Sequence, residues 1–134
     1  MRERIGTAIS PLDEALGMRL VEVHDDHVVL RLDASRTALG GEDPRPYLHG
    51  GALATCVDTA GWAAIEAVSP GGGWVAIDLR CDFVRLAGLE PHRVIGRCLR
   101  AGRTLALADV VVEPWDAPGR LVATGRAQFM RTGA

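Results

Sequence analysis

The sequence contains no lysine, so arginine supplies all of the basic side-chain charge of its 134 residues. The 15 basic residues are slightly outnumbered by 17 acidic ones, and the formal net charge is -2. Nucleic-acid binding depends on a basic stripe or patch, and the chain has neither. This charge balance also gives no general attraction to anionic membranes. We therefore expect no nucleic acid and no membrane among its partners.

Aromatic residues and long apolar runs are also scarce. Aromatics make up 4% of the chain, so a core must come mainly from Val, Leu, Ile and Ala within an apolar content of 48%. No stretch approaches the roughly 20 apolar residues of a membrane span. The first 17 residues lack the apolar segment of a signal peptide. We expect one cytoplasmic globular domain over residues 1–134.

Metal-ligand spacing is missing as well. Cys56, Cys81 and Cys98 are an odd number of cysteines without a close pair, which indicates reduced and mostly buried thiols. The histidines are His24, His27, His49 and His92. They do not combine with the cysteines at ligand spacing, so we expect no metal and no redox cofactor.

Before residue 50 the pattern predicts short elements. Ser10 and Pro11 suit a helix start, with Ser10 as the cap, and the helix should stop near Gly17. Residues 18–23 and 28–33 are apolar and rich in β-branched side chains, which predicts a hairpin. Residues 40–46 hold two prolines and two glycines, which predicts a loop.

Residues 51–68 change in character and predict one long helix. This segment is rich in Ala, lacks proline, and is long enough for about five helical turns. Its few polar side chains do not form a continuous face, and a helix that is apolar nearly all round is buried. In so short a chain, other elements must wrap it.

Four strand-like segments follow, at residues 74–84, 93–100, 105–113 and 121–130, separated by turn-like residues. We expect them to form a meander in one antiparallel sheet that curls around the helix. Two copies placed edge to edge would then protect an open strand.

Asp58 is the most informative residue of the predicted helix. A carboxylate in a buried apolar helix costs free energy unless it is paired, hydrogen-bonded or used in catalysis. Its neighbours one turn away are Ala54, Thr55, Gly61 and Trp62. None carries a charge. Either an arginine from the sheet forms a structural ion pair with Asp58, or the carboxylate is functional.

His49, Gly50 and Gly51 stand directly before this helix. Free backbone N–H groups and the helix dipole favour negative charge at a helix start, and glycine lets a substrate approach closely. Such a turn suits the oxyanion of an acyl-transfer intermediate. It can equally be an ordinary loop-to-helix turn, and the pairing with Asp58 two turns later favours the functional interpretation.

These motifs resemble the hotdog-fold thioesterases of the phenylacetate-degradation type. The resemblance rests on LHGGAL at residues 48–53 followed by VDTA at 57–60. It continues in AIDLR at 76–80, FVR at 83–85, GRTLA at 102–106 and GRLVATG at 119–125. It implies an α+β hotdog fold, a long central helix wrapped by a curved antiparallel sheet.

The resemblance also implies a function and its residues. The substrate would be an acyl-CoA with a medium-chain or aryl acyl group, cleaved at a site between two subunits of a homodimer, itself part of a dimer of dimers. Asp58 would be the general base or the nucleophile. Gly50 or Gly51 would supply an oxyanion N–H from the partner subunit. His49 would lie near the thioester, or would fix the loop through a backbone hydrogen bond.

Other positions are expected to bind substrate. Thr59 and Trp62 neighbour Asp58, and Trp62 forms either the floor of an acyl pocket or part of the core. Arg85 and Arg103 lie where the family's CoA tends to pass, and arginine suits phosphate. The alternative for each arginine is a side chain that is simply solvated.

Two departures from the family pattern concern catalysis. Asp43 stands where the family often has Asn, and Ala76 stands where it commonly has Ser or Thr. Losing one such donor costs on the order of tenfold or more in rate. The alternative is therefore an acyl-CoA-binding protein with little or no turnover. A hydratase or dehydratase is disfavoured by the interval between the His-Gly-Gly turn and Asp58.

Overall fold

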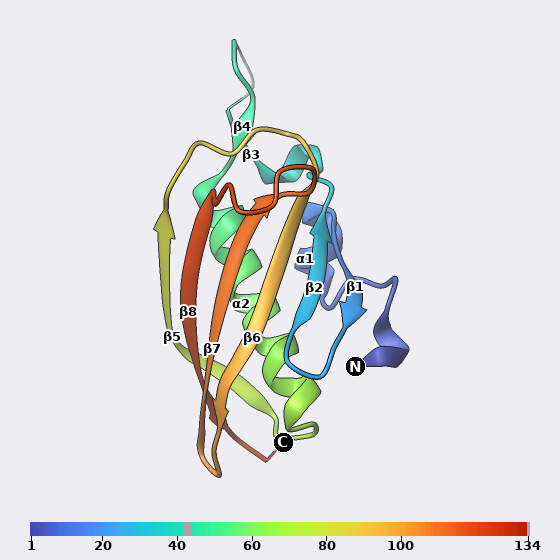
Figure 1. The fold of residues 1–134 in the computed structure, drawn as a ribbon, viewed down its shortest axis with the longest axis vertical. Helices are drawn as coiled ribbons and strands as arrows, with labels where there is room; N and C mark the ends of the chain where they lie inside the picture. Colours follow the sequence, from blue (N-terminus) through green and yellow to red (C-terminus); the bar gives the residue numbers. More distant parts are fainter. Residues whose placement is uncertain (42–43, 134) are drawn as a thin grey trace.

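The computed structural model describes residues 1–41 and 44–133. One long helix lies against one face of a six-stranded antiparallel sheet (Figure 1). The helices are α1 (Pro11–Leu16) and α2 (Gly50–Val68), with 3-10 turns η1 (Arg2–Arg4) and η2 (Arg36–Ala38). The strands are β1 (Met18–Val23), β2 (Val28–Leu32), β3 (Leu39–Gly41), β4 (Tyr47–Leu48), β5 (Trp74–Phe83), β6 (His92–Ala101), β7 (Leu105–Pro114) and β8 (Ala123–Arg131). This arrangement confirms the predicted hotdog fold.

Helix α2 is the centre of the core, as its composition predicted. Nine of its residues are buried, most of them alanine or larger aliphatic side chains. Glycines on the sheet let the helix approach closely: a Cβ at Gly96 would collide with the Ala60 carbonyl oxygen, and one at Gly125 would lie 2.6 Å from Cγ1 of Val57. The close approach buries one side of α2 on the sheet and leaves the side that carries Asp58 to face away from it.

The strand order corrects the predicted meander. The sheet runs β1-β2-β6-β7-β8-β5, so only β6, β7 and β8 form a meander. Strand β5 pairs with β8 along its whole length and forms an edge of the sheet (Figure 1). The turn-like residues after β5 do not make a hairpin, because residues 84–91 cross the end of the sheet and pair with other elements, as in the hydrogen bond from Leu48 N to the Ala87 carbonyl.

The amino-terminal elements follow the prediction closely. Ser10 caps α1, Pro11 occupies its first position, and Gly17 ends it in the left-handed conformation at a φ of 93°. Strands β1 and β2 form the expected hairpin. Helix α1 packs beside α2, which places the first turn of α1 next to the middle of the long helix.

The predicted loop at residues 40–46 is partly wrong. Its flanks pair as β3 and β4, with Leu39 opposite Leu48 and Gly41 opposite Tyr47. Short strands of two or three residues carry no periodic signal, which is why the glycines and prolines dominated the prediction. Asp43, the expected substrate-binding residue of this segment, lies outside the described residues.

Two further predictions can be compared with this fold. Cys56, Cys81 and Cys98 are free thiols, of which Cys56 is fully buried and the other two are partly buried. Among residues 1–41 and 44–133, no helix combines the length and apolar character needed to cross a bilayer.

Candidate active site

Asp58 faces a hollow of about 320 Å³ between α2 and the segment that leads into α1. The hollow is lined by Ile9, Ser10, Leu12, Asp13, Thr55, Asp58, Thr59 and Trp62. Thr55, Asp58 and Trp62 are spaced by three and four residues, so they share one face of the helix, as the sequence predicted. The site therefore combines the Asp58 carboxylate with an apolar wall of Ile9, Leu12 and Trp62.

The Asp58 carboxylate is partly buried, and its pKa is raised. Burial is the larger cause, and the negative charge of Asp13 is the second. The alternative role, a structural ion pair with an arginine from the sheet, is not found: among the described residues, no salt bridge to Asp58 forms. Removal from water and a like charge both disfavour the ionised carboxylate, so it has a higher proton affinity than an ordinary aspartate.

Asp13 is a part of this site that the sequence interpretation missed. Its exposed fraction is 1%. The Ser10 hydroxyl donates to one carboxylate oxygen at 2.7 Å, and the Thr59 hydroxyl donates to the other at 2.8 Å. Thr59, expected to bind substrate, thus directs its hydroxyl to Asp13. Asp13 falls in the first turn of a capped helix, where an acidic residue is ordinary, so the only local signal was the serine three residues before it.

The start of α2 shows how the His-Gly-Gly turn is built. Nδ1 of His49 accepts a hydrogen bond of 2.7 Å from the Gly51 N–H, so His49 caps the helix through its side chain. This contact matches the alternative role in which His49 fixes the loop. The Gly51 N–H is therefore already used within the turn.

Phe83 closes one side of that turn. A Cβ at Gly50 would lie 3.3 Å from Cζ of Phe83, a tight contact that a small shift of the ring would relieve. The Phe83 ring itself is 58% exposed, at the end of the edge strand β5. The amino terminus of α2 is thus next to an apolar surface that nothing in the described chain covers.

The remaining predicted residues do not gather around Asp58. Ala76 lies on β5 opposite Phe129, and it is exposed. Arg85 follows β5 and donates to the Leu121 carbonyl at 2.8 Å. Arg103 is exposed in the turn between β6 and β7, at the other end of the sheet (Figure 1). One chain alone therefore cannot bring Arg85 and Arg103 to the same phosphate.

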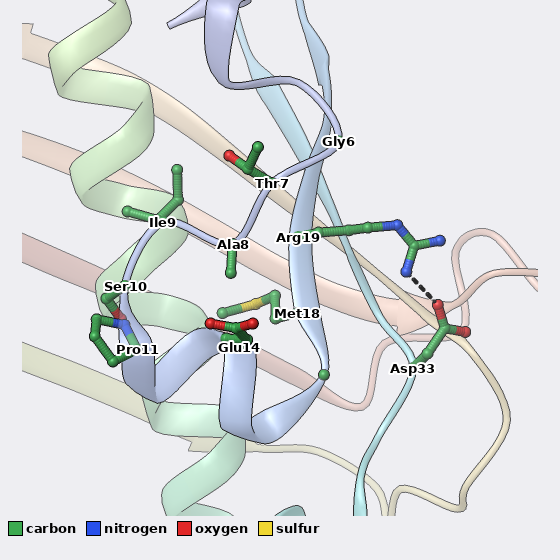
Figure 2. A pocket seen from close by; sticks show the side chains of 11 residues that line it. Gly6, Thr7, Ala8, Ile9, Ser10, Pro11, Glu14, Met18, Arg19 and Asp33 are labelled. Atoms are coloured by element: carbon green, nitrogen blue, oxygen red, sulfur yellow. Dashed lines mark hydrogen bonds and ion pairs between the residues drawn. The ribbon is translucent and has the colours of Figure 1, made fainter.

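A larger hollow of about 660 Å³ lies on the other side of Ser10 (Figure 2). Ile9 and Ser10 line both hollows, so this short segment is the wall between them. The charged groups of the larger hollow include Arg19 and Asp33, which are joined at 2.9 Å, as Figure 2 shows. Its other carboxylate, Glu14, is exposed. The hollow around Asp58 is the better candidate because its carboxylate is partly withdrawn from water.

The part of the chain that the structure describes holds no group of three or more His, Cys, Asp or Glu side chains placed to bind a metal. In the hollow itself, the side-chain groups that can exchange protons or donate hydrogen bonds are the two carboxylates, the hydroxyls of Ser10, Thr55 and Thr59, and the indole N–H of Trp62.

Comparison with known proteins identifies the family. Residues 46–123 match the family model described as the thioesterase superfamily, which is more than half of the chain. The fold and this match together place the chain among hotdog proteins, and it belongs to the thioesterase superfamily.

Individual relatives agree with this assignment. Human acyl-coenzyme A thioesterase 13 is 35% identical over 80 residues, covering 59% of this chain and 56% of the human protein, so the chain spans little more than half of that relative. A crystal structure of a thioesterase-superfamily protein is 32% identical with a TM-score of 0.76, and the match covers 90% of this chain and 89% of the other. A mutant of the phenylacetic acid degradation protein PaaI from Thermus thermophilus is 25% identical, with a TM-score of 0.75 and coverage of 91% and 99%. The resemblance to the phenylacetate-degradation type is thus confirmed.

Proposed function

We propose that this protein hydrolyses acyl-CoA thioesters to a free acid and CoA, with Asp58 as its general base or nucleophile. The observation that carries the proposal is the Asp58 carboxylate, which faces an apolar-walled hollow without a cation partner among the described residues. The name of the human relative, an acyl-coenzyme A thioesterase, supports the substrate class.

Two routes through Asp58 balance chemically. As a base, Asp58 takes a proton from water while the oxygen of that water attacks the thioester carbonyl. The tetrahedral intermediate then expels the CoA thiolate, which recovers the proton. As a nucleophile, Asp58 attacks the carbonyl itself, expels the thiolate and leaves a mixed anhydride that water cleaves. A raised pKa suits the first route, because a stronger base takes the proton more readily.

An oxyanion donor at Gly50 would come from a second chain. Gly50 and Asp58 are eight residues apart on one helix, which is about 12 Å along the axis at 1.5 Å per residue. A reacting carbonyl must lie about 3 Å from both the base or nucleophile and the oxyanion donor. One α2 helix cannot meet both conditions, so we assign the Gly50 N–H of one subunit to the Asp58 of its partner.

The edge strand β5 fits the interface that this site needs. Its apolar residues Val75, Ile77 and Leu79 are 39–51% exposed, and Phe83 next to Gly50 is 58% exposed. An exposed apolar edge strand is a ready template for pairing with another chain. We propose a homodimer formed along β5, with two such dimers joined in a dimer of dimers.

The apolar wall of the hollow determines which acyl groups fit. Trp62 presents an aromatic surface beside Asp58, and Ile9 and Leu12 complete the wall. These side chains suit a medium-chain or aryl acyl group better than a short polar one. The two arginines expected near CoA, Arg85 and Arg103, would contribute to one substrate only if they came from different subunits.

The test is release of free thiol from a panel of aliphatic and aryl acyl-CoAs, with wild type beside Asp58→Asn. We expect hydrolysis by the wild type and its loss in the variant, with the fold checked by circular dichroism. Full hydrolysis by Asp58→Asn would remove the proposed role of Asp58.

The second candidate is an acyl-CoA-binding protein with little turnover. Ala76 favours it, because alanine lacks the hydroxyl that the family commonly places there. Binding of acyl-CoA measured by calorimetry, without thiol release from any member of the panel, would establish this function in place of hydrolysis.

A further inference from the structure

A second carboxylate lies beside the proposed catalytic one. Asp13 belongs to α1 and Asp58 to α2, and both line the same hollow. Asp13 is 1% exposed, whereas Asp58 remains partly open to the hollow. A buried carboxylate costs free energy unless hydrogen bonds compensate for the lost water. The position of Asp13 therefore requires an explanation beyond helix capping.

The surroundings of Asp13 hold its carboxylate in one orientation. The Ser10 hydroxyl donates to Oδ2 at 2.7 Å and itself accepts from the Asp13 N–H at 3.2 Å. The Thr59 hydroxyl donates to Oδ1 at 2.8 Å from the other helix. Both carboxylate oxygens thus accept a hydrogen bond, which holds the carboxylate in place. The bond from Thr59 also ties α1 to the residue that directly follows Asp58.

The two carboxylates are the charged groups of this hollow. Among the described residues that line it, the titratable side chains are Asp13 from α1 and Asp58 from α2, and the others are apolar or bear a hydroxyl. Glu14, the neighbouring acid of α1, is exposed and lines the other hollow. The charge of Asp13 is accordingly felt by Asp58 without a nearby cation in the hollow to offset it.

We propose that Asp13, fixed by the hydroxyls of Ser10 and Thr59, is a positioning residue of the thioesterase site that acts on hydrolysis through Asp58. The inference rests on the proposed function of Asp58. A like charge in the same site makes a carboxylate more basic. Asp13 supplies that charge, and Asp58 is the carboxylate that it makes more basic. Burial raises the pKa of Asp58 first, and the charge of Asp13 raises it further.

The experiment is the pH profile of kcat/KM for acyl-CoA hydrolysis by wild type, Asp13→Asn and Glu14→Gln. In Asp13→Asn the like charge is gone, so we expect the acid limb to move to lower pH and the plateau to fall as Asp58 becomes a weaker base. Glu14→Gln removes the adjacent charge of the same helix, and we expect its profile to match the wild type. A purely structural role of Asp13 would lower the rate at every pH and leave the limb in place, which would overturn the proposal.

A second measurement does not require the variant to fold. The carboxyl carbon of Asp58 is followed by NMR titration in the wild type without substrate. We expect its midpoint above the ordinary aspartate value, because burial and the charge of Asp13 both disfavour the ionised form of Asp58. A midpoint at the ordinary value would overturn the proposal. Full hydrolysis by Asp58→Asn would refute the catalytic role of Asp58. An inactive Asp58→Asn together with an Asp13→Asn variant that keeps the wild-type pH profile would refute only the role of Asp13.

Discussion

At the scale of single residues, the site depends on groups kept in unfavourable electrostatic states. Asp58 loses part of its hydration in the hollow and lies near the charge of Asp13. A group whose pKa is raised by folding destabilises the folded state wherever it is ionised. Stability is thus given up to obtain a basic carboxylate, a trade that is common at active sites.

This trade predicts that Asp58→Asn raises the unfolding temperature near pH 7. Above the raised pKa the wild type carries the unfavourable charge, and the uncharged amide does not. As the pH falls toward the ordinary aspartate value of 3.8, Asp58 takes up a proton and the advantage of the variant should fade. Thermal unfolding of both proteins from pH 4 to pH 8 measures the difference. The account predicts that the stability gain of Asp58→Asn over wild type is larger at pH 7 than at pH 4. A gain that is smaller at pH 7 than at pH 4 would contradict it.

The residue scale also shows what the sequence could and could not predict. Asp58 and Trp62 were found because helical spacing alone places them on one face. Asp13 was missed because its burial arises from the packing of α1 against α2, which no local pattern encodes. The capping of α2 by His49 was foreseen only as one of two roles, since the rotamer of His49 decides which role it fills.

At the scale of elements, α2 is held against the sheet by residues without side chains. Gly96 on β6 faces the backbone of Ala60, and a Cβ added to Gly61 on α2 would lie 3.2 and 3.6 Å from the Cβ atoms of Ala127 and Ala108. The separation between helix and sheet decides where Asp58 lies relative to α1. Small residues at these contacts therefore position the site as well as the core.

A pair of alanine substitutions tests this contact. Gly96→Ala should destabilise the protein by about 2 kcal/mol or more, because its Cβ would meet the rigid backbone of Ala60. Gly61→Ala should stay within about 1 kcal/mol of wild type, since the gain in helix propensity offsets its milder contact with Ala127. Urea unfolding gives both values. Equal effects of the two substitutions would show that the approach of the helix to the sheet is not the constraint.

The elements themselves were largely predictable, whereas their order in the sheet was not. The apolar segment that forms α2 and the four strand-like segments after it carry strong periodic or compositional signals. The place of β5 at the edge depends on its pairing with β8, about fifty residues later in the chain. Turn-like residues between β5 and β6 predicted a continuous meander, but a crossing connection needs the same residue types.

At the scale of the whole molecule, the proposed site is incomplete in one chain. The apolar residues of β5 are exposed, and the separation of Gly50 from Asp58 along α2 means that the proposed Gly50 donor would come from a second chain. Both features are explained together if a second copy pairs along β5. The expected homodimer stays a prediction, and it links oligomeric state to activity.

Leu79→Glu tests that link. Leu79 is 39% exposed on the edge strand, so a carboxylate there is tolerated by a monomer and disfavoured in an interface. We expect light scattering to show a folded monomer with little thioesterase activity. Leu99→Glu is the matched control, because Leu99 is an exposed apolar residue of β6 away from the edge strand, at 48%. A wild-type protein that is a stable, active monomer would refute the shared site.

The most direct test of the central claim is the ratio of kcat/KM between wild type and Asp58→Asn, measured by thiol release from the best acyl-CoA of the panel at pH 7 to 8. A base or nucleophile removed from the reaction costs about 100-fold or more. The account predicts at least that loss, with acyl-CoA binding retained. A variant within a few-fold of the wild type would contradict it and would move the search for the catalytic group away from Asp58.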